Sequence, residues 1–98
     1  MTPMSDSDDN ARLRMLISGR VQGVFFRRAA ADEAYGLGLK GWARNCPDGT
    51  VEIVVEGRRR NLKMLAAWAH SGPPVAHVTE VVEEWSEFLN EFSEFTIR

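Results

Sequence analysis

Apolar residues recur along this chain with two different spacings, and the switches between them predict the order of its strands and helices. In residues 13–18, Leu13, Met15 and Ile17 recur with a period of two, which is typical of a strand with one face on a core. Residues 26–36 are mostly helix formers, with apolar side chains near helical spacing and glycines at 36 and 38 that favour a stop. The first third therefore predicts a strand, a loop and a helix.

Residues 40–57 predict a β-hairpin. Its strands, residues 40–45 and 50–57, flank Cys46-Pro47-Asp48-Gly49, which has proline, aspartate and glycine in the order of a turn. One face of the second strand is apolar, whereas the other carries glutamates at 52 and 56 beside a valine. We expect these two glutamates to point outward.

The last third predicts a second helix followed by two strands. Apolar residues from Leu62 to Ala69 are spaced i, i+3, i+4 and i+7, and this pattern ends before Gly72-Pro73-Pro74, which no helix continues through. Residues 75–85 and 95–98 have the composition of strands, and residues 86–94 predict a loop of unspecified shape.

The resulting order is β-α-β-β-α-β with a short fifth strand at the C-terminal end. Because both apolar helix stripes need the same apolar sheet face, this order predicts an α+β, ferredoxin-like sandwich: an antiparallel sheet with both helices on one face. We expect residues 11–98 to form one domain, because the 98-residue chain is 44% hydrophobic and long enough for one core. Residues 1–10 are polar and acidic, and we expect them to be disordered.

Composition and charge exclude several classes of function. A net charge of −2 and a pI of about 5.6 do not favour binding to nucleic acid or to an acidic membrane. No apolar run is long enough to span a bilayer, and the single cysteine, Cys46, with two scattered histidines gives neither a disulfide framework nor a metal-ligand spacing. We therefore expect a cytoplasmic monomer without metal or cofactor, and any anion must be recognised locally.

The segment from Gly19 to Arg27 has the features of a small-anion site. Glycines at 19 and 23 let successive backbone N–H groups turn inward, and the helix start that follows adds further unsatisfied donors. An arginine near a helix N-terminus is locally unfavourable, and Asp32 and Glu33 are poorly spaced to pair with it. A bound anion is one counter-charge. The alternative is that the Arg27 stem packs on Phe26 with its guanidinium in water.

The same segment begins an ordered series of motifs that resembles the acylphosphatase family. It is followed by Leu37-Gly38-Leu39-Lys40-Gly41-Trp42-Ala43-Arg44-Asn45, Asp48-Gly49-Thr50-Val51-Glu52, Glu56-Gly57, Gly72-Pro73-Pro74 and Phe95-Thr96-Ile97-Arg98. The resemblance covers nearly all of the chain after the acidic leader. It implies metal-independent hydrolysis of the carboxyl-phosphate bond of small acyl phosphates, giving a carboxylate and inorganic phosphate without a covalent enzyme intermediate.

The resemblance also implies a role for each site residue. The phosphoryl oxygens would be held by the backbone amides of Gln22, Gly23, Val24, Phe25 and Phe26. Arg27 would bind the same group, Asn45 would orient the attacking water, and Gly19 would shape the loop. From its position alone, without the resemblance, Asn45 is better explained as a side chain that supports the following turn. Arg20 and Cys46 neighbour these residues and are assigned no role.

Two other functions remain as alternatives. One is an acylphosphatase-like domain that handles carbamoyl phosphate within a larger hydrogenase-maturation protein. Against it, the chain shows no further domain and none of the zinc-finger cysteines of those proteins. The other is a single-stranded RNA-binding module, which shares the β-α-β-β-α-β order. The strands that would stack bases carry no aromatic residue, and the glutamates at 52 and 56 would repel phosphates.

Overall fold

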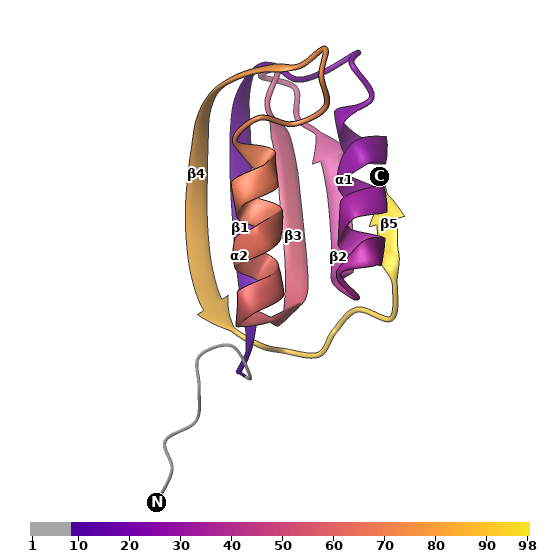
Figure 1. The fold of residues 1–98 in the computed structure, drawn as a ribbon, viewed down its shortest axis with the longest axis vertical. Helices are drawn as coiled ribbons and strands as arrows, with labels where there is room; N and C mark the ends of the chain where they lie inside the picture. The colour runs from indigo at the N-terminus through magenta and orange to yellow at the C-terminus, as the bar shows by residue number, and fades with distance from the viewer. Residues whose placement is uncertain (1–8) are drawn as a thin grey trace, which may run out of the picture.

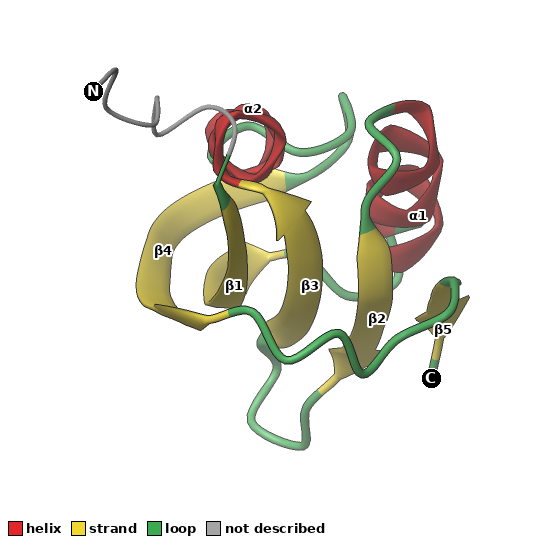
Figure 2. Ribbon diagram, turned by 90° about the horizontal axis from the view of Figure 1, so that it is seen from below, coloured by secondary structure: helices red, strands yellow, loops and turns green. Residues whose placement is uncertain are grey.

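The computed structural model describes residues 9–98 as five strands and two helices packed in two layers (Figure 1). The sheet has the order β4-β1-β3-β2-β5, and both helices cover the same face of it (Figure 2). This arrangement confirms the ferredoxin-like α+β sandwich. The elements are β1 (Asn10–Arg20), α1 (Phe26–Gly36), β2 (Lys40–Asn45), β3 (Val51–Arg58), α2 (Arg59–Ala69), β4 (His77–Glu87) and β5 (Phe95–Ile97).

The sheet differs from the prediction at one edge, because it is mixed rather than antiparallel. β5 pairs with β2 in parallel, whereas the other three pairings are antiparallel. A long connection after β4 crosses the end of the sheet and returns the chain to β2 in the parallel direction (Figure 2). Strand spacing in a sequence gives no signal for this direction, so the wholly antiparallel prediction was wrong for the last strand.

The first strand begins earlier than predicted. Asn10 is already part of β1, where it pairs with Arg58, and the carbonyl of Asp9 accepts a hydrogen bond of 2.8 Å from the N–H of Arg59. Residues 1–8, the rest of the predicted acidic leader, lie outside the described residues. No helix within residues 9–98 has the length and apolar character required to cross a bilayer.

The core lies between the helices and one face of the sheet. Phe26, the first residue of α1, is 2% exposed, and its ring lies 5.3 Å from that of Trp68 on α2. A Cβ at Gly72 would overlap the Phe26 ring, so this glycine does more than stop α2. Burial of Phe26 therefore fixes the start of α1 and the loop that precedes it. The largest fully buried side chains are Phe26, Leu13, Met15, Ile17, Ile53, Leu62, Leu65, Val21, Val51 and Val55.

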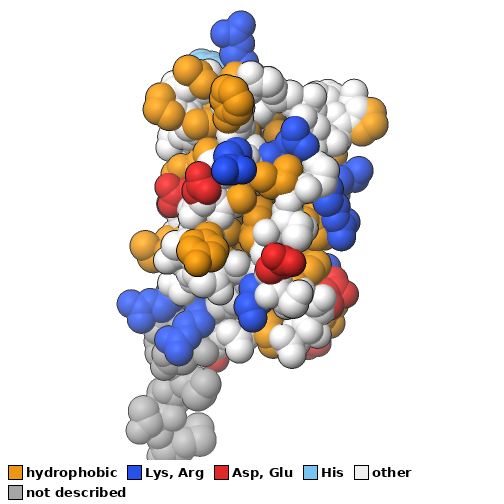
Figure 3. Space-filling view, turned by 90° about the vertical axis from the view of Figure 1, so that its right-hand side faces the viewer, with side chains coloured by type: hydrophobic (Ala, Val, Ile, Leu, Met, Phe, Trp, Pro, Cys, Tyr) orange, Lys and Arg blue, Asp and Glu red, His pale blue; other side chains and the backbone are white. Residues whose placement is uncertain are grey.

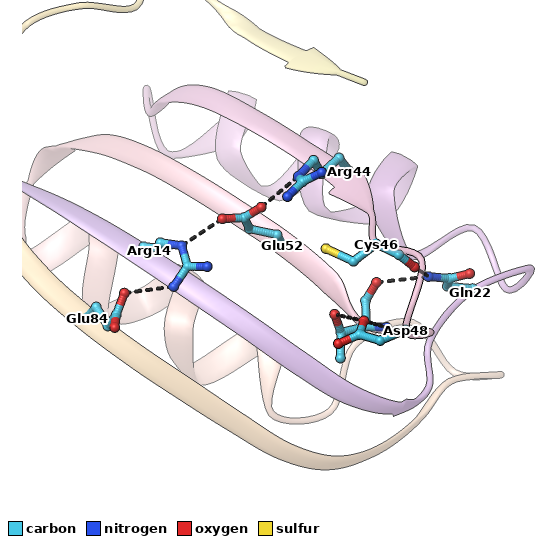
Figure 4. A network of polar contacts seen from close by, with 8 residues as sticks. Arg14, Gln22, Arg44, Cys46, Asp48, Glu52 and Glu84 are labelled. Atoms are coloured by element: carbon cyan, nitrogen blue, oxygen red, sulfur yellow. Dashed lines mark hydrogen bonds and ion pairs between the residues drawn. The ribbon is translucent and has the colours of Figure 1, made fainter.

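The sheet face away from the helices is covered by charged side chains rather than left open. Glu52 and Glu56 lie on this face, as predicted, but they are only 6% and 3% exposed. The Glu52 carboxylate accepts hydrogen bonds of 2.6 Å from both Arg14 and Arg44 (Figure 4). Glu56 pairs with Arg12 at 3.3 Å. The expectation that these glutamates form an exposed, repelling surface was therefore wrong, because arginines cover and neutralise them.

Glu56 also fixes the segment between β4 and β5 that the sequence pattern left unspecified. Its two carboxylate oxygens accept hydrogen bonds from the backbone N–H groups of Leu89, at 2.6 Å, and Glu91, at 3.1 Å. Arg12 bridges Glu56 to the Glu91 carboxylate and lies over the Phe92 ring. This anchoring directs the chain toward β5 at the opposite edge of the sheet.

Removing the Glu52 charge is expected to make the free energy of unfolding depend less on pH in the acidic range. Burial raises the pKa of Glu52, but the hydrogen bonds from Arg44 and Arg14 outweigh it and bring the pKa below its ordinary value of 4.5. The stabilisation is therefore complete above about pH 4.5 and is lost as the pH falls through the lowered pKa. We expect Glu52→Gln to cost about 1–2 kcal/mol at pH 7, because both arginines are partly solvated.

Urea unfolding of the wild type and of Glu52→Gln between pH 7 and pH 3 measures this difference. The difference in free energy of unfolding between the wild type and Glu52→Gln should become smaller toward pH 3. Glu80→Gln, at an exposed position of β4, provides the control and should keep a small, constant difference. A gap for Glu52→Gln that stayed constant across this range would contradict the assigned charge state.

Candidate active site

The backbone of the loop between β1 and α1 adopts a conformation that requires glycine at two positions and is strained at a third. β1 changes register against β4 between Ser18 and Gly19, and a Cβ at Gly19 would overlap the backbone carbonyl of His77. Gly23 has a φ of 75°, and Phe25, the residue before α1, is left-handed with a φ of 61°. A left-handed aromatic residue is uncommon and costs free energy. Such strain is typical of functional loops.

Several backbone donors in this loop have no acceptor in the part of the chain that the structure describes. The first helical hydrogen bond of α1 runs from the N–H of Ala29 to the carbonyl of Phe25, and no side chain caps the helix N-terminus. Within residues 9–98, the backbone N–H groups of residues 22–25 donate no hydrogen bond. The first residue of α2, in contrast, donates its N–H to Asp9. The β1–α1 loop therefore presents unpaired donors together with the positive end of α1.

A cavity of about 280 Å³ brings most of the predicted site residues together. We call it the phosphoryl cavity, after the group that the sequence resemblance predicts it to bind. Its walls come from the β1–α1 loop, the first turn of α1, the end of β2 and the C-terminal strand β5. It is lined by Gly23, Phe25, Phe26, Arg27 and Asn45, which the sequence predicted, and by Val21, Arg28 and Ile97, which it did not. Gly19, Gln22 and Val24 lie in or next to the same loop but outside this lining.

The side chain of Gln22 has a structural role that the sequence analysis did not predict. Its side-chain amide donates hydrogen bonds to the carbonyls of Cys46, at 2.8 Å, and Thr50, at 2.9 Å (Figure 4). These two residues flank the turn that directly follows Asn45. The Gln22 side chain therefore connects the β1–α1 loop to the β2–β3 hairpin, and it holds the loop and Asn45 at a fixed separation.

Arg27 lies at the rim of the phosphoryl cavity, and no Asp or Glu side chain within residues 9–98 pairs with it. Its guanidinium donates a 2.6 Å hydrogen bond to the main-chain oxygen of Arg98, the last residue of the printed sequence. The neighbouring Arg28 instead lies 3.9 Å from Asp32. Arg98 in turn places its own guanidinium over the Trp42 ring, at 4.3 Å. The main-chain oxygen of Arg98 thus positions the Arg27 guanidinium, whose remaining N–H donors can face a ligand in the cavity.

Asn45 is not the residue that supports the hairpin turn. Asp48 has that role: its carboxylate accepts hydrogen bonds from the N–H of Thr50, at 3.0 Å, and from the Thr50 hydroxyl, at 2.7 Å. These bonds lower the pKa of Asp48, the hydroxyl bond most. The Asn45 side chain makes no hydrogen bond within the described part of the chain and lines the phosphoryl cavity instead. Its amide is therefore free to bind a ligand or water.

Other chemically reactive side chains lie outside this constellation. Cys46 is half-buried in the hairpin turn and does not line the phosphoryl cavity. His70 lies 3.7 Å from Glu83 on the α2 side of the molecule, and His77 is exposed at the start of β4. Among residues 9–98, no three His, Cys, Asp or Glu side chains are grouped to hold a metal ion.

Comparison with known proteins gives a consistent assignment. The acylphosphatase family model matches residues 13–97. The acylphosphatase of Anaeromyxobacter dehalogenans is 51% identical over 90 residues, which cover 92% of this chain and 97% of the relative. The crystal structure of the acylphosphatase from Bacillus subtilis has a TM-score of 0.87 and 35% identity, covering 90% of this chain and 98% of that one.

A smaller likeness extends to one large protein. The crystal structure of full-length HypF matches with a TM-score of 0.83 and 25% identity, over 92% of this chain but only 12% of the HypF chain. The motifs named in the sequence, the arrangement of strands and helices and the near-complete coverage of the relatives all agree. The chain belongs to the acylphosphatase family.

Proposed function

We propose that residues 11–98 hydrolyse acyl phosphates to a carboxylate and inorganic phosphate in the phosphoryl cavity. The observation that carries the proposal is the coincidence, in one cavity, of backbone donors without acceptors and a guanidinium without an Asp or Glu partner, both judged within residues 9–98. The amides of residues 22–26 and Arg27 would bind the phosphoryl oxygens. Asn45 would orient the attacking water, and Gly19 would keep the loop in its required shape.

This set of groups is sufficient for the chemistry. The leaving group is a carboxylate, whose conjugate acid has a pKa of roughly 4–5 by analogy with aspartate and glutamate, so it departs without a general acid. The remaining barrier comes from charge on the equatorial phosphoryl oxygens and from alignment of water opposite the leaving oxygen. Fixed backbone donors and one guanidinium would stabilise the charge on the phosphoryl oxygens, and the Asn45 amide would align the water.

The alternatives receive less support. Carbamoyl phosphate carries the same phosphoryl group, and the likeness to HypF keeps it as a second candidate, but the chain is 51% identical to a protein named acylphosphatase and 25% identical to HypF. RNA binding is disfavoured because β1 and β3, the strands that would stack bases, carry no aromatic residue. Cytoplasmic location and a monomeric state stay predictions from the sequence.

Phosphate release from acetyl phosphate in the presence and absence of a chelator tests the proposed function. We expect turnover that a chelator does not change and that inorganic phosphate inhibits competitively, because both ligands would use the same donors. A matched assay with a phosphate monoester should give no release, since its alkoxide leaving group requires protonation. Activity that disappeared with the chelator would contradict the site.

A further inference from the structure

A second and larger cavity, of about 530 Å³, lies beside the phosphoryl cavity. One wall is a face of α1, with Arg28, Ala31, Asp32 and Tyr35 at helical spacing. The facing wall is β5, with Phe95 and Ile97. We call this cavity, walled by these six residues, the α1–β5 groove. Figure 3 looks onto this side of the molecule, where apolar side chains are exposed among Lys, Arg, Asp and Glu side chains.

The α1–β5 groove continues directly from the phosphoryl cavity. Arg28 and Ile97 line both. A molecule whose phosphoryl group occupies the first cavity would therefore have its other end next to the groove. From Arg28 to Tyr35, α1 rises by about 10 Å at roughly 1.5 Å per residue. That length accommodates an acyl chain of about six carbons.

The chemistry of the groove suits an uncharged, apolar occupant. Its interior wall is formed by aliphatic and aromatic side chains, among them Ala31, Leu39 and Phe95. The charged residues at its rim, Arg28 and Asp32, lie 3.9 Å apart and offset each other. Two large side chains along it are exposed, Tyr35 at 86% and Ile97 at 42%. Burial of such surface by a ligand is favourable.

We infer that the α1–β5 groove binds the acyl group of the substrate, so that the chain favours acyl phosphates with an apolar acyl chain over acetyl phosphate. This inference rests on the proposed function and adds the substrate class. The end of the groove farthest from the phosphoryl cavity carries Lys40 and Glu94, so the apolar stretch is bounded. The preference should rise with chain length and level off at about six carbons.

A series of acetyl, butyryl and hexanoyl phosphate tests the inference in the wild type. These compounds have leaving groups of nearly equal pKa, so differences in kcat/KM report contacts with the acyl chain rather than intrinsic reactivity. Each methylene buried in the groove should raise kcat/KM about twofold to fourfold. We expect hexanoyl phosphate to exceed acetyl phosphate at least tenfold.

Two variants test whether the preference for longer acyl chains arises in the α1–β5 groove. Ala31→Gln, which places a polar side chain in the middle of it, should lower the ratio of hexanoyl to acetyl kcat/KM about tenfold. Tyr35→Ser, at an exposed position where folding is not at risk, should lower it about threefold. Ala67→Gln, at an exposed position of α2, is the matched control and should keep the wild-type ratio.

The outcomes separate this inference from the proposed function. Hydrolysis of all three phosphates with equal kcat/KM, or the wild-type ratio in both groove variants, would overturn the inference and leave acyl phosphate hydrolysis intact. If none of the three phosphates is hydrolysed, both fail.

Discussion

Replacing Arg27 with alanine is expected to lower kcat/KM for acyl phosphate hydrolysis about 10³-fold and to weaken competition by inorganic phosphate. The guanidinium has no Asp or Glu partner in the described residues and lies at the rim of the phosphoryl cavity, so its donors beyond the one bound to Arg98 are available to the phosphoryl group. Removing one arginine that stabilises a transferring phosphoryl group typically costs that much or more. Steady-state kinetics with acetyl phosphate, and inhibition constants for phosphate, measure both effects.

A lysine at this position is not expected to restore activity. An ammonium provides a point charge without the planar pair of donors that matches two phosphoryl oxygens, so Arg27→Lys should still lose about 10²-fold. Arg60→Ala removes an exposed arginine from α2 and is the matched control, with kinetics within twofold of the wild type. An Arg27→Ala variant that retained near-normal turnover would refute the assignment of this cavity.

Replacing Asn45 with alanine is expected to lower kcat about 10²-fold while the inhibition constant of inorganic phosphate changes little. The Asn45 amide lines the phosphoryl cavity and is not engaged within residues 9–98, so its loss removes a group that positions water rather than one that binds the phosphoryl oxygens. The hairpin should remain intact because Asp48 and Thr50 hold the turn.

Asn61→Ala provides the comparison for Asn45→Ala. Asn61 donates a 3.1 Å hydrogen bond to the carbonyl of Leu37, which has a structural role far from the reacting groups. Its removal should lower the free energy of unfolding by about 1 kcal/mol without lowering kcat. If Asn45→Ala instead raised the phosphate inhibition constant in proportion to the fall in kcat, Asn45 would be a binding residue and its proposed role would be wrong.

The sequence predicted the fold well because its local signals agree with one another. Alternation in β1 and β3, helical spacing in α1 and α2, and the Pro-Asp-Gly turn all specify local structure, and both apolar helix stripes need one sheet face. The direction of β5 lacks such a signal. It depends on Glu56, which holds the backbone of Leu89 and Glu91 and so directs the last connection to β2.

The sequence predicted the glycines and the arginine of the candidate site, but it did not predict the contacts that support them. Gly19, Gly23 and Arg27 predict an anion loop because their chemistry is local, and that assignment stays a prediction. The hydrogen bonds from the Gln22 side chain to the hairpin, and from the Arg27 side chain to the main-chain oxygen of Arg98, join segments far apart in the sequence. Spacing rules for a single helix or strand contain no information about such pairs. The burial of Glu52 was missed for the same reason, since Arg14 and Arg44 come from different strands.

The most direct test of the central claim is a crystal structure determined in saturating phosphate. The account predicts one phosphate in the phosphoryl cavity, within hydrogen-bond distance of the N–H groups of residues 22–26 and of the Arg27 guanidinium. A phosphoryl cavity that stayed empty, with the guanidinium directed away from it, would contradict the account.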